Sequence, residues 1–136
     1  MLAKKLCLLV LLLGAPPALA ADNQAGPYLF DLMKQPSYRA AWTSMLAGET
    51  VPDWVETYAK TLDGPAIPSI ILQVDGKAHL LGFVCKAHEC GENQLYVLFA
   101  PDGARAWGLL LMGGKERKWL GAPDESVQTA ILSGVE

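Results

Sequence analysis

The sequence predicts an α+β fold in which an antiparallel sheet of about five strands forms a meander and helices pack on one face of it. Three observations support this prediction. Apolar residues recur at helical spacing between residues 27 and 62, and they alternate at the two-residue spacing of strands between residues 69 and 120. Turn-forming residues separate the predicted strands. Helices followed by consecutive antiparallel strands are typical of this class.

The first 20 residues have the pattern of a secretory signal peptide. Lys4 and Lys5 form a basic start, residues 6–13 are an uninterrupted apolar run of eight, and Ala18-Leu19-Ala20 is a small-residue cleavage site. This run is less than half of the roughly 20 residues that a membrane crossing requires. We therefore expect residues 1–20 to be cleaved after export, and residues 21–136 to form a single domain.

The first half of the mature chain is predicted to be helical. One segment starts at Pro27, a second runs from Pro36 to Gly48, and Pro52 opens a third that stops at Asp63-Gly64-Pro65. Apolar positions at spacings of three and four are expected to face the core. They are Tyr28, Leu29, Leu32, Met33, Tyr38, Ala41, Trp42, Met45, Leu46, Trp54, Val55, Tyr58, Ala59 and Leu62.

The second half is predicted to contain two hairpins, one further strand and a helix. The predicted strands are residues 69–74, 77–84, 94–100, 105–112 and 118–120. Asp75-Gly76 is the strongest hairpin signal in the chain, and Pro101-Asp102-Gly103 connects the second pair. Residues 115–118 are charged and predict an exposed turn. A helix is expected after Asp124, with Val127, Ala130, Ile131 and Leu132 on its inward side.

The net charge of the mature chain limits the classes of partner that it could bind. Lys4 and Lys5 account for two of the 11 basic residues, so the 116 residues that remain from 136 after cleavage carry nine basic and 14 acidic side chains. The mature net charge is therefore −5. An acidic chain without a basic patch is poorly suited to nucleic acid or to an anionic membrane. We expect neither of these as a partner, and a cationic protein fits better.

The connection between the second and third predicted strands is the most specific segment of the chain. It reads Cys85-Lys86-Ala87-His88-Glu89-Cys90 and holds the only two cysteines left after cleavage. Export and an even cysteine count favour a disulfide. Its Cα atoms must lie within about 7 Å, whereas six extended residues span about 17 Å, so residues 86–89 must form a closed ring. A ring this small stabilises the fold by only about 2 kcal/mol. A better explanation than fold stability is that the ring holds its side chains rigid before a partner binds.

Catalysis and metal binding fit this ring less well. It offers one cation, one imidazole and one carboxylate, and it has no nucleophile. A zinc site would need Cys85, His88, Glu89 and Cys90 at a spacing that strains tetrahedral geometry. Four residues separate the cysteines, whereas a thioredoxin-like redox motif has two. We therefore expect no metal, no cofactor and no enzymatic activity.

The ring resembles that of the Ivy family, the periplasmic inhibitors of vertebrate (c-type) lysozyme in Gram-negative bacteria. The family pattern is typically Cys-Lys-Pro-His-Asp-Cys, and four of its six positions are identical here: Cys85, Lys86, His88 and Cys90. The export signal, the length and the order of elements fit as well. The resemblance implies a periplasmic inhibitor whose ring enters the cleft of c-type lysozyme, where His88 hydrogen-bonds the two catalytic carboxyl groups.

Two ring positions depart from the family pattern and leave alternatives open. Ala87 stands where the family has proline, which removes a fixed φ worth about 0.4–1 kcal/mol, and Glu89 replaces a shorter aspartate. One alternative is a weaker or retargeted paralogue that acts on lytic transglycosylases. The other is a periplasmic module that binds peptidoglycan or another protein, in which the ring is only a scaffold and His88 a solvated loop residue.

The remaining conspicuous residues have simpler interpretations. His79 alternates with Leu81 and Phe83, so we expect a partly buried strand residue. The tryptophans are expected in the core and not on a sugar-binding platform. They are Trp42, Trp54, Trp107 and Trp119. An exposed edge of the sheet would allow two copies to pair as a homodimer.

Overall fold

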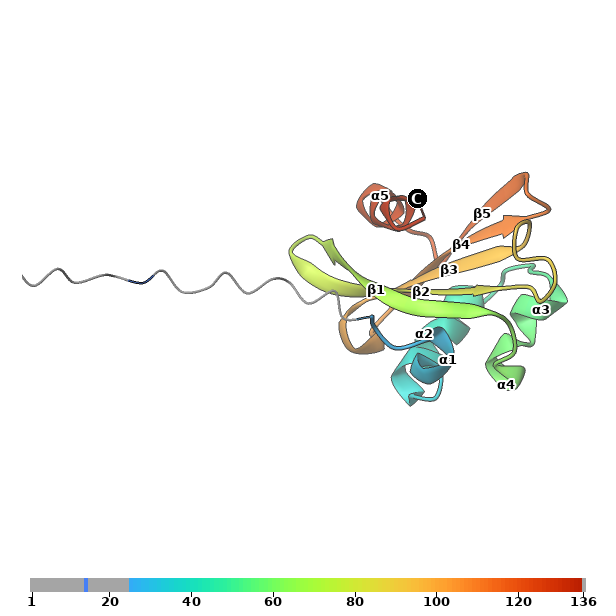
Figure 1. Ribbon diagram of the computed structural model, residues 1–136, viewed down its shortest axis with the longest axis horizontal. Coiled ribbons are helices and arrows are strands. Elements are labelled where there is room, and N and C mark those ends of the chain that lie inside the picture. Colours follow the sequence, from blue (N-terminus) through green and yellow to red (C-terminus); the bar gives the residue numbers. More distant parts are fainter. Residues whose placement is uncertain (1–13, 15–24, 136) are drawn as a thin grey trace, which may run out of the picture.

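A computed structural model describes residue 14 and residues 25–135. At its centre is an antiparallel sheet of five strands in the order β1-β2-β3-β4-β5, so that each strand pairs with the next in the sequence (Figure 1). The strands are β1 (Ala66–Val74), β2 (Lys77–Cys85), β3 (Gln94–Phe99), β4 (Ala106–Met112) and β5 (Glu116–Leu120). The helices are α1 (Leu29–Leu32), α2 (Pro36–Leu46), α3 (Asp53–Glu56), α4 (Tyr58–Thr61), the 3-10 helix η1 (Pro101–Gly103) and α5 (Glu125–Ser133). The α+β class and the five-stranded meander are confirmed.

Helices α1–α4 cover one face of the sheet, as their apolar stripes predict (Figure 1). Pro36 stands at the start of α2, where its missing N–H has no helical partner to lose. The segment predicted from Pro52 onward is two short helices that meet at Thr57, and Leu62 ends the second in a left-handed conformation. The buried residues of the first apolar cluster, between these helices and the sheet, are Leu29, Leu32, Met33, Tyr38, Ala41, Trp42, Met45, Val55, Tyr58, Val84, Leu95, Val97, Phe99, Ala106, Leu110 and Leu120.

Helix α5 lies on the opposite face of the sheet (Figure 1), which corrects the prediction that the helices pack on one face. It buries Val127 and Ile131 in a second apolar cluster together with Leu81, Leu98 and Leu109 of the central strands. The central strands are therefore apolar on both faces, as strands covered on both sides usually are. The second face needs its own cover, and α5 supplies it.

Strand β1 forms one edge of the sheet and begins earlier than predicted. It contains Pro68, which an edge strand tolerates because it needs fewer ladder hydrogen bonds. The pairing register shifts between Ile67 and Ile70. These two side chains and Ile71 are exposed. Pairing of two copies through this edge stays a prediction.

Strand β5 forms the other edge and also begins earlier than predicted. Residues 116–118 of the charged cluster lie in β5, and Lys115 alone of the cluster lies in the turn before it, which corrects the prediction of a turn over 115–118. Lys118 is held against the helical layer, because its Nζ lies 3.0 Å from a carboxylate oxygen of Glu49 and donates to the Thr50 carbonyl at 2.8 Å. The strand extends into the cluster because Glu116 and Arg117 pair with Met112 and Leu111 of β4.

Tyr58 buries a hydroxyl group in the helical layer. Its side chain is 0% exposed, and its ring centroid lies 5.4 Å from that of Trp42. The hydroxyl oxygen has no hydrogen-bond partner among the described residues. Burial, and secondly the carboxylate of Asp31, raises the pKa of Tyr58 from 10.0 to about 12. The hydroxyl therefore destabilises the native state, and increasingly so in alkali.

We expect Tyr58→Phe to keep or raise the free energy of unfolding near neutral pH, because a buried hydroxyl without a partner costs about 1–3 kcal/mol. The folded pKa lies above the unfolded one, so the native protein loses stability as the pH rises from about 10 toward about 12. The phenylalanine variant should lose less over this range. Denaturant unfolding at about pH 7 and about pH 11 measures both effects. A variant that is less stable at neutral pH and equally sensitive to alkali would contradict the expectation.

Among the described residues, none of the helices combines the length and the apolar character needed to cross a membrane. The signal peptide predicted at residues 1–20 lies outside the described residues, apart from Gly14.

Candidate binding loop

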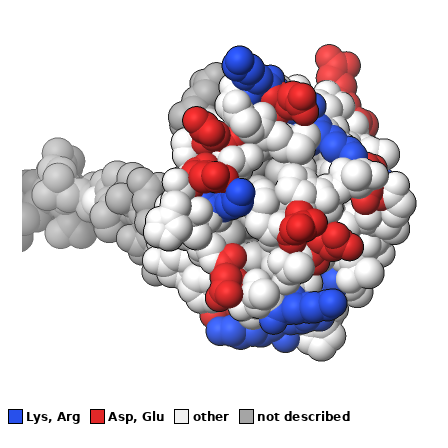
Figure 2. All heavy atoms as spheres, turned by 90° about the vertical axis from the view of Figure 1, so that its right-hand side faces the viewer, with Lys and Arg blue, Asp and Glu red and all other residues white. Residues whose placement is uncertain are grey.

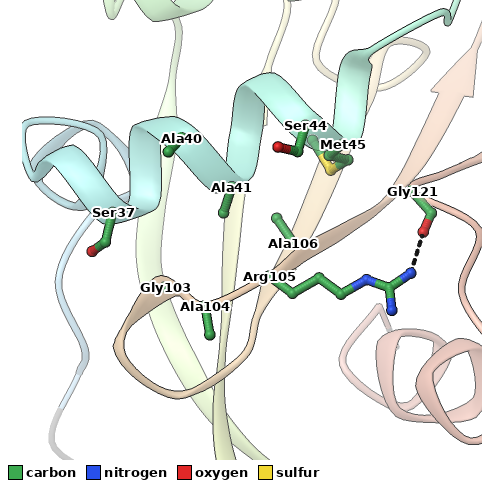
Figure 3. Close-up of a pocket in the computed structure, with 10 residues that line it drawn as sticks. All are labelled: Ser37, Ala40, Ala41, Ser44, Met45, Gly103, Ala104, Arg105, Ala106 and Gly121. Atoms are coloured by element: carbon green, nitrogen blue, oxygen red, sulfur yellow. Dashed lines mark hydrogen bonds between the residues drawn. The ribbon is translucent and has the colours of Figure 1, made fainter.

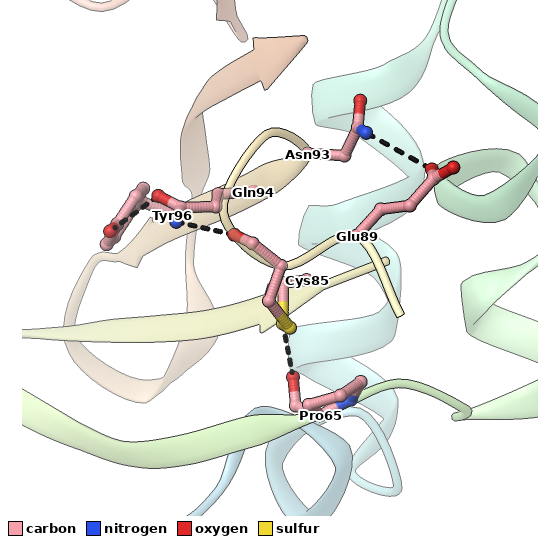
Figure 4. Close-up of a disulfide and its surroundings, with 7 residues drawn as sticks. Pro65, Cys85, Glu89, Asn93, Gln94 and Tyr96 are labelled. Atoms are coloured by element: carbon pink, nitrogen blue, oxygen red, sulfur yellow. Dashed lines mark hydrogen bonds between the residues drawn. A yellow bond between two sulfur atoms is a disulfide. The ribbon is translucent and has the colours of Figure 1, made fainter. Parts of the chain in front are cut away.

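The predicted ring lies where β2 turns into β3, at one end of the sheet (Figure 1). A disulfide joins Cys85 and Cys90, whose Cα atoms are 4.9 Å apart, which confirms the expected pairing (Figure 4). Cys85 is 1% exposed, and its N–H donates to the Pro65 carbonyl at 3.1 Å. Its sulfur lies 3.5 Å from the same oxygen, a contact without a proton because the sulfur is bridged. The ring is thus anchored in the core at one end.

Residues 86–89 form a tight turn at the exposed end of the ring. The Glu89 N–H donates to the Lys86 carbonyl at 3.0 Å. His88, at the third position of the turn, has a φ of 67°, whereas Ala87, at the second, does not have a positive φ. This sign pattern is that of a type II turn. A left-handed backbone costs a non-glycine residue about 1–2 kcal/mol, so the ring holds His88 in a conformation that a free loop would seldom adopt.

The base of the ring is held by hydrogen bonds that continue the sheet into it. The Lys86 N–H donates to the Asn93 carbonyl at 3.0 Å, which extends the β2–β3 ladder by one step. The Gln94 side-chain amide donates to the Cys90 carbonyl at 2.6 Å, and the Tyr96 hydroxyl donates to the Gln94 side-chain oxygen at 3.1 Å (Figure 4). Both ends of the ring are therefore fixed to strands.

The turn between β4 and β5 supports the same connection from the side. The Gly114 N–H donates to the Glu92 carbonyl at 3.0 Å, and the Gly113 N–H donates to the side-chain oxygen of Asn93 at 3.3 Å. Both glycines have a positive φ, a conformation that glycine adopts readily. The two turns therefore stiffen each other.

An ion pair lies within the ring. Lys86 Nζ is 2.7 Å from a carboxylate oxygen of Glu89, and the two side chains are 44% and 45% exposed. The same oxygen accepts a hydrogen bond from the Asn93 side chain at 3.3 Å (Figure 4). A pair this exposed contributes at most about 1 kcal/mol. Its larger effect is to orient Lys86 and to balance the charges of Lys86 and Glu89 within the ring.

The surface around the ring is polar and of mixed sign. Figure 2 shows this end of the molecule, where acidic and basic side chains are interspersed and no large area carries one sign only. A hollow of about 280 Å³ lies between the ring and helices α3 and α4. Residues that line it include Trp54, Thr57, Thr61, Lys86 and Ala87. A partner that receives the ring would also meet this flank.

The ring is suited to non-covalent binding. Both of its sulfurs are in the disulfide, so neither is a thiolate nucleophile or metal ligand. Within residue 14 and residues 25–135, no group of three or more His, Cys, Asp and Glu side chains could hold a metal ion. His88 is exposed. Its neutral imidazole can donate one hydrogen bond and accept another.

The structure does not bring the two histidines together. His79 is 6% exposed on β2 and stacks on Trp107, with ring centroids 6.1 Å apart. The prediction of a partly buried strand residue is confirmed for the strand, and the side chain is more deeply buried than predicted. The tryptophans are all buried or partly buried, as predicted: Trp42, Trp54, Trp107 and Trp119.

Sequence reasoning missed a groove of about 480 Å³ between α2 and the segment from η1 to β4 (Figure 3). Helix α2 lines it with small side chains, namely Ser37, Ala40, Ala41 and Ser44. Arg105 lies at its edge and donates to the Gly121 carbonyl at 3.3 Å (Figure 3). The available signal was the spacing of those small residues, which places them on one helix face.

Comparisons with known proteins agree on one family. The model of the family described as "Inhibitor of vertebrate lysozyme (Ivy)" matches residues 37–130. A Pseudomonas aeruginosa protein named "Inhibitor of vertebrate lysozyme" is 33% identical over 130 residues, which cover 85% of this chain and 82% of that protein. An uncharacterised Yersinia pestis protein is 27% identical over 123 residues, 81% of this chain and 77% of its own. A second P. aeruginosa protein, also uncharacterised, is 33% identical over 138 residues, 89% of this chain and 86% of its own.

Proposed function

The chain belongs to the Ivy family of inhibitors of vertebrate lysozyme, and on this premise we propose that it inhibits c-type lysozyme by placing the Cys85–Cys90 ring in the active-site cleft. It acts as an inhibitor and not as an enzyme. The observation that supports this best is the exposed His88 on a disulfide-closed turn that is fixed to the sheet at both ends.

The imidazole of His88 matches the chemistry of a lysozyme active site. Lysozyme uses two carboxyl groups, of which one is kept protonated and the other is ionised. A ring with a donor nitrogen and an acceptor nitrogen can hydrogen-bond both groups at once. A hydrogen bond to a charged group contributes about 1.5–3 kcal/mol. Occupation of the cleft by the ring then excludes the sugar chain.

The rigidity of the ring lowers the entropy lost on binding. Ordering one residue of a flexible loop costs about 1–2 kcal/mol in backbone entropy alone. Residues 86–89 are already ordered by the disulfide and by the turn hydrogen bond at 3.0 Å. Association therefore orders little more of the chain.

The opposite net charges of this chain and of c-type lysozyme favour their association. The mature chain carries −5, and c-type lysozymes are basic, so the two proteins attract each other over a Debye length of about 10 Å at 0.1 M salt. We expect the association rate to fall as salt is added. The dissociation rate should change less, because it depends on the contacts in the cleft.

A titration tests the proposal. The purified mature protein is added to c-type lysozyme while lysis of a bacterial cell-wall suspension is followed by turbidity. Inhibition that saturates near one inhibitor per lysozyme is expected. Full lysis with a large excess would refute inhibition of c-type lysozyme. In that case, inhibition of a lytic transglycosylase would identify that enzyme as the target. Sedimentation with purified peptidoglycan alone would instead identify a peptidoglycan-binding module.

The proposed site of action is the periplasm, reached through the signal peptide at residues 1–20. Osmotic-shock fractionation of a Gram-negative host should release a protein whose mass corresponds to cleavage after Ala20. Retention of the full-length chain in the cytoplasm would contradict this.

We expect Ala87→Pro to strengthen inhibition. Ala87 occupies the second position of a type II turn, where proline is favoured, and the turn and ladder bonds use the N–H groups of Lys86 and Glu89. Proline removes the backbone freedom that the loop still has before binding, which is worth at most about 1 kcal/mol and corresponds to at most about five-fold tighter binding. Inhibition constants of wild type, Ala87→Pro and Ala87→Gly measure the trend. The glycine variant should be the weakest of the three, and a proline variant weaker than wild type would refute the expectation.

A further inference from the structure

A second recess lies at the end of the sheet opposite the ring. It has a volume of about 570 Å³ and is bounded by the β1–β2 hairpin, the β3–β4 connection and the start of α5. Its walls are partly apolar, with Val74, Trp107 and Val127 among them. Its polar side chains are those of Asp75, Lys77, His79 and Asp124. None of these residues contributes to the ring or its supports.

His79 is the buried polar group of this recess. It is 6% exposed, and its Nδ1 lies 2.9 Å from the Lys77 carbonyl oxygen. A carbonyl can only accept, so Nδ1 carries the proton and the Nε2 of the neutral ring is an acceptor. The ring is held nearly parallel to Trp107, at 25°. Nε2 has no hydrogen-bond partner among the described residues. Nε2 is not among the buried atoms that lack a partner, so it reaches the solvent of the recess and is free to accept a hydrogen bond there.

Two carboxylates line the same recess as His79. Hydrogen bonds from the Val127 N–H and then the Ser126 hydroxyl lower the pKa of Asp124, so it stays ionised. Both bonds go to its Oδ1, at 2.9 Å each, and leave Oδ2 for another donor. Asp75 is exposed at the hairpin. The recess therefore offers three acceptor groups.

Two cations lie near these acceptors. Lys77 lines the recess with an exposed side chain, as Asp75 and Asp124 do. Arg105 lies outside the lining, where its guanidinium is 5.0 Å from the Trp107 ring and donates to the Gly121 carbonyl, and its charge contributes to the lowered pKa of Asp124. A ligand with several N–H donors, a positive charge and an aliphatic part fits the acceptors and the apolar walls together.

We propose that this recess, here called the His79 pocket, binds a primary alkylammonium group, whose N–H donors reach His79 Nε2 and the carboxylates of Asp75 and Asp124 while its methylene groups lie against Trp107 and Val127. A free diamine and a lysine side chain share this chemistry. The pocket acts independently of lysozyme inhibition, because it lies at the other end of β2 from the ring.

NMR titration of the mature ¹⁵N-labelled protein tests the pocket. The probes are 1,5-diaminopentane, an acetylated and amidated lysine peptide, and pentanoate as the anionic counterpart of the same length. Saturable shifts at His79, Trp107 and the start of α5 are expected with at least one of the two amines and not with pentanoate. Binding of the diamine alone or of the peptide alone supports the pocket and identifies the source of the ammonium group. No saturable shift with either amine, or equal binding of pentanoate, overturns the proposal.

Two variants locate the binding. His79→Phe keeps an aromatic ring against Trp107 and removes Nε2, while Asp75→Asn keeps a residue that tolerates the φ of 49° at this position. Each should weaken amine binding at least about tenfold, which corresponds to 1.4 kcal/mol. Asp63→Asn, an exposed acid near the ring, is the matched control and should bind as wild type does. If His79→Phe does not fold, Asp75→Asn decides alone, and unchanged binding by it refutes the proposal.

Discussion

His88→Ala is expected to weaken inhibition of c-type lysozyme by about ten- to hundred-fold, because it removes a hydrogen-bonding group that addresses charged carboxyls, worth about 1.5–3 kcal/mol. The side chain is exposed and stands on a turn that is closed by backbone atoms. Its removal should therefore leave the fold and the free energy of unfolding nearly unchanged. Inhibition constants from the lysis assay, with thermal unfolding of the same samples, measure both quantities.

Matched variants separate the imidazole from the turn that carries it. His88 has a φ of 67°, and asparagine tolerates this conformation better than alanine does. His88→Asn thus keeps the turn and still offers a donor and an acceptor, but its shorter side chain carries both on one carbon and does not reach as far as the imidazole does. It should therefore be impaired nearly as much as the alanine variant. Glu92→Gln changes an exposed residue of the same connection outside the ring and should inhibit almost normally. Full potency of both His88 variants would rule out the imidazole as the inhibitory group.

The parts of the fold that the sequence predicts correctly depend on local signals. Asp75-Gly76 and Pro101-Asp102-Gly103 stand at chain reversals whatever packs around them, because their backbone preferences are intrinsic. The face on which α5 packs has no local signal of this kind. The central strands are nearly continuous apolar runs, so the alternation that would separate the face carrying Leu81 from its opposite is hidden. Their apolar composition itself was the clue that both faces are covered.

In the candidate site too, the sequence predicts the features that depend on local signals and misses those that depend on distant contacts. The cysteine count predicts the disulfide, but the left-handed φ of His88 depends on the closed turn. Support from Gly113 and Gly114 depends on β5 folding back beside the connection. The burial of His79 follows from alternation in β2, whereas Asp124 joins its pocket only because α5 crosses the second face. Contacts between residues distant in sequence are thus what sequence reasoning missed.

Removal of the disulfide should impair inhibition at least as much as removal of the imidazole. Opening a ring of this size lowers the free energy of unfolding by about 2 kcal/mol, which a chain of this length tolerates. The effect on binding by the folded protein is larger, because the loop is no longer held in one shape. If residues 86–89 become free to move, binding must order them at about 1–2 kcal/mol each, partly offset by the ladder and turn bonds that remain. The summed loss is at least as large as the 1.5–3 kcal/mol of one charge-assisted contact.

Two variants make this measurable without a thiol reagent, which would also attack disulfides of the target. Cys90→Ser leaves Cys85 as a thiol that is 1% exposed and therefore unreactive. In Cys85→Ser/Cys90→Ser, the new hydroxyl at position 85 can donate to the Pro65 carbonyl, which lies 3.5 Å from the sulfur it replaces. Both variants should stay folded by circular dichroism, unfold several degrees earlier, and inhibit lysozyme at least about tenfold more weakly. Folded variants that inhibit like wild type would mean that the hydrogen bonds from β3 and from the β4–β5 turn suffice to present His88, and the argument from ring rigidity would fall while that from the imidazole stands.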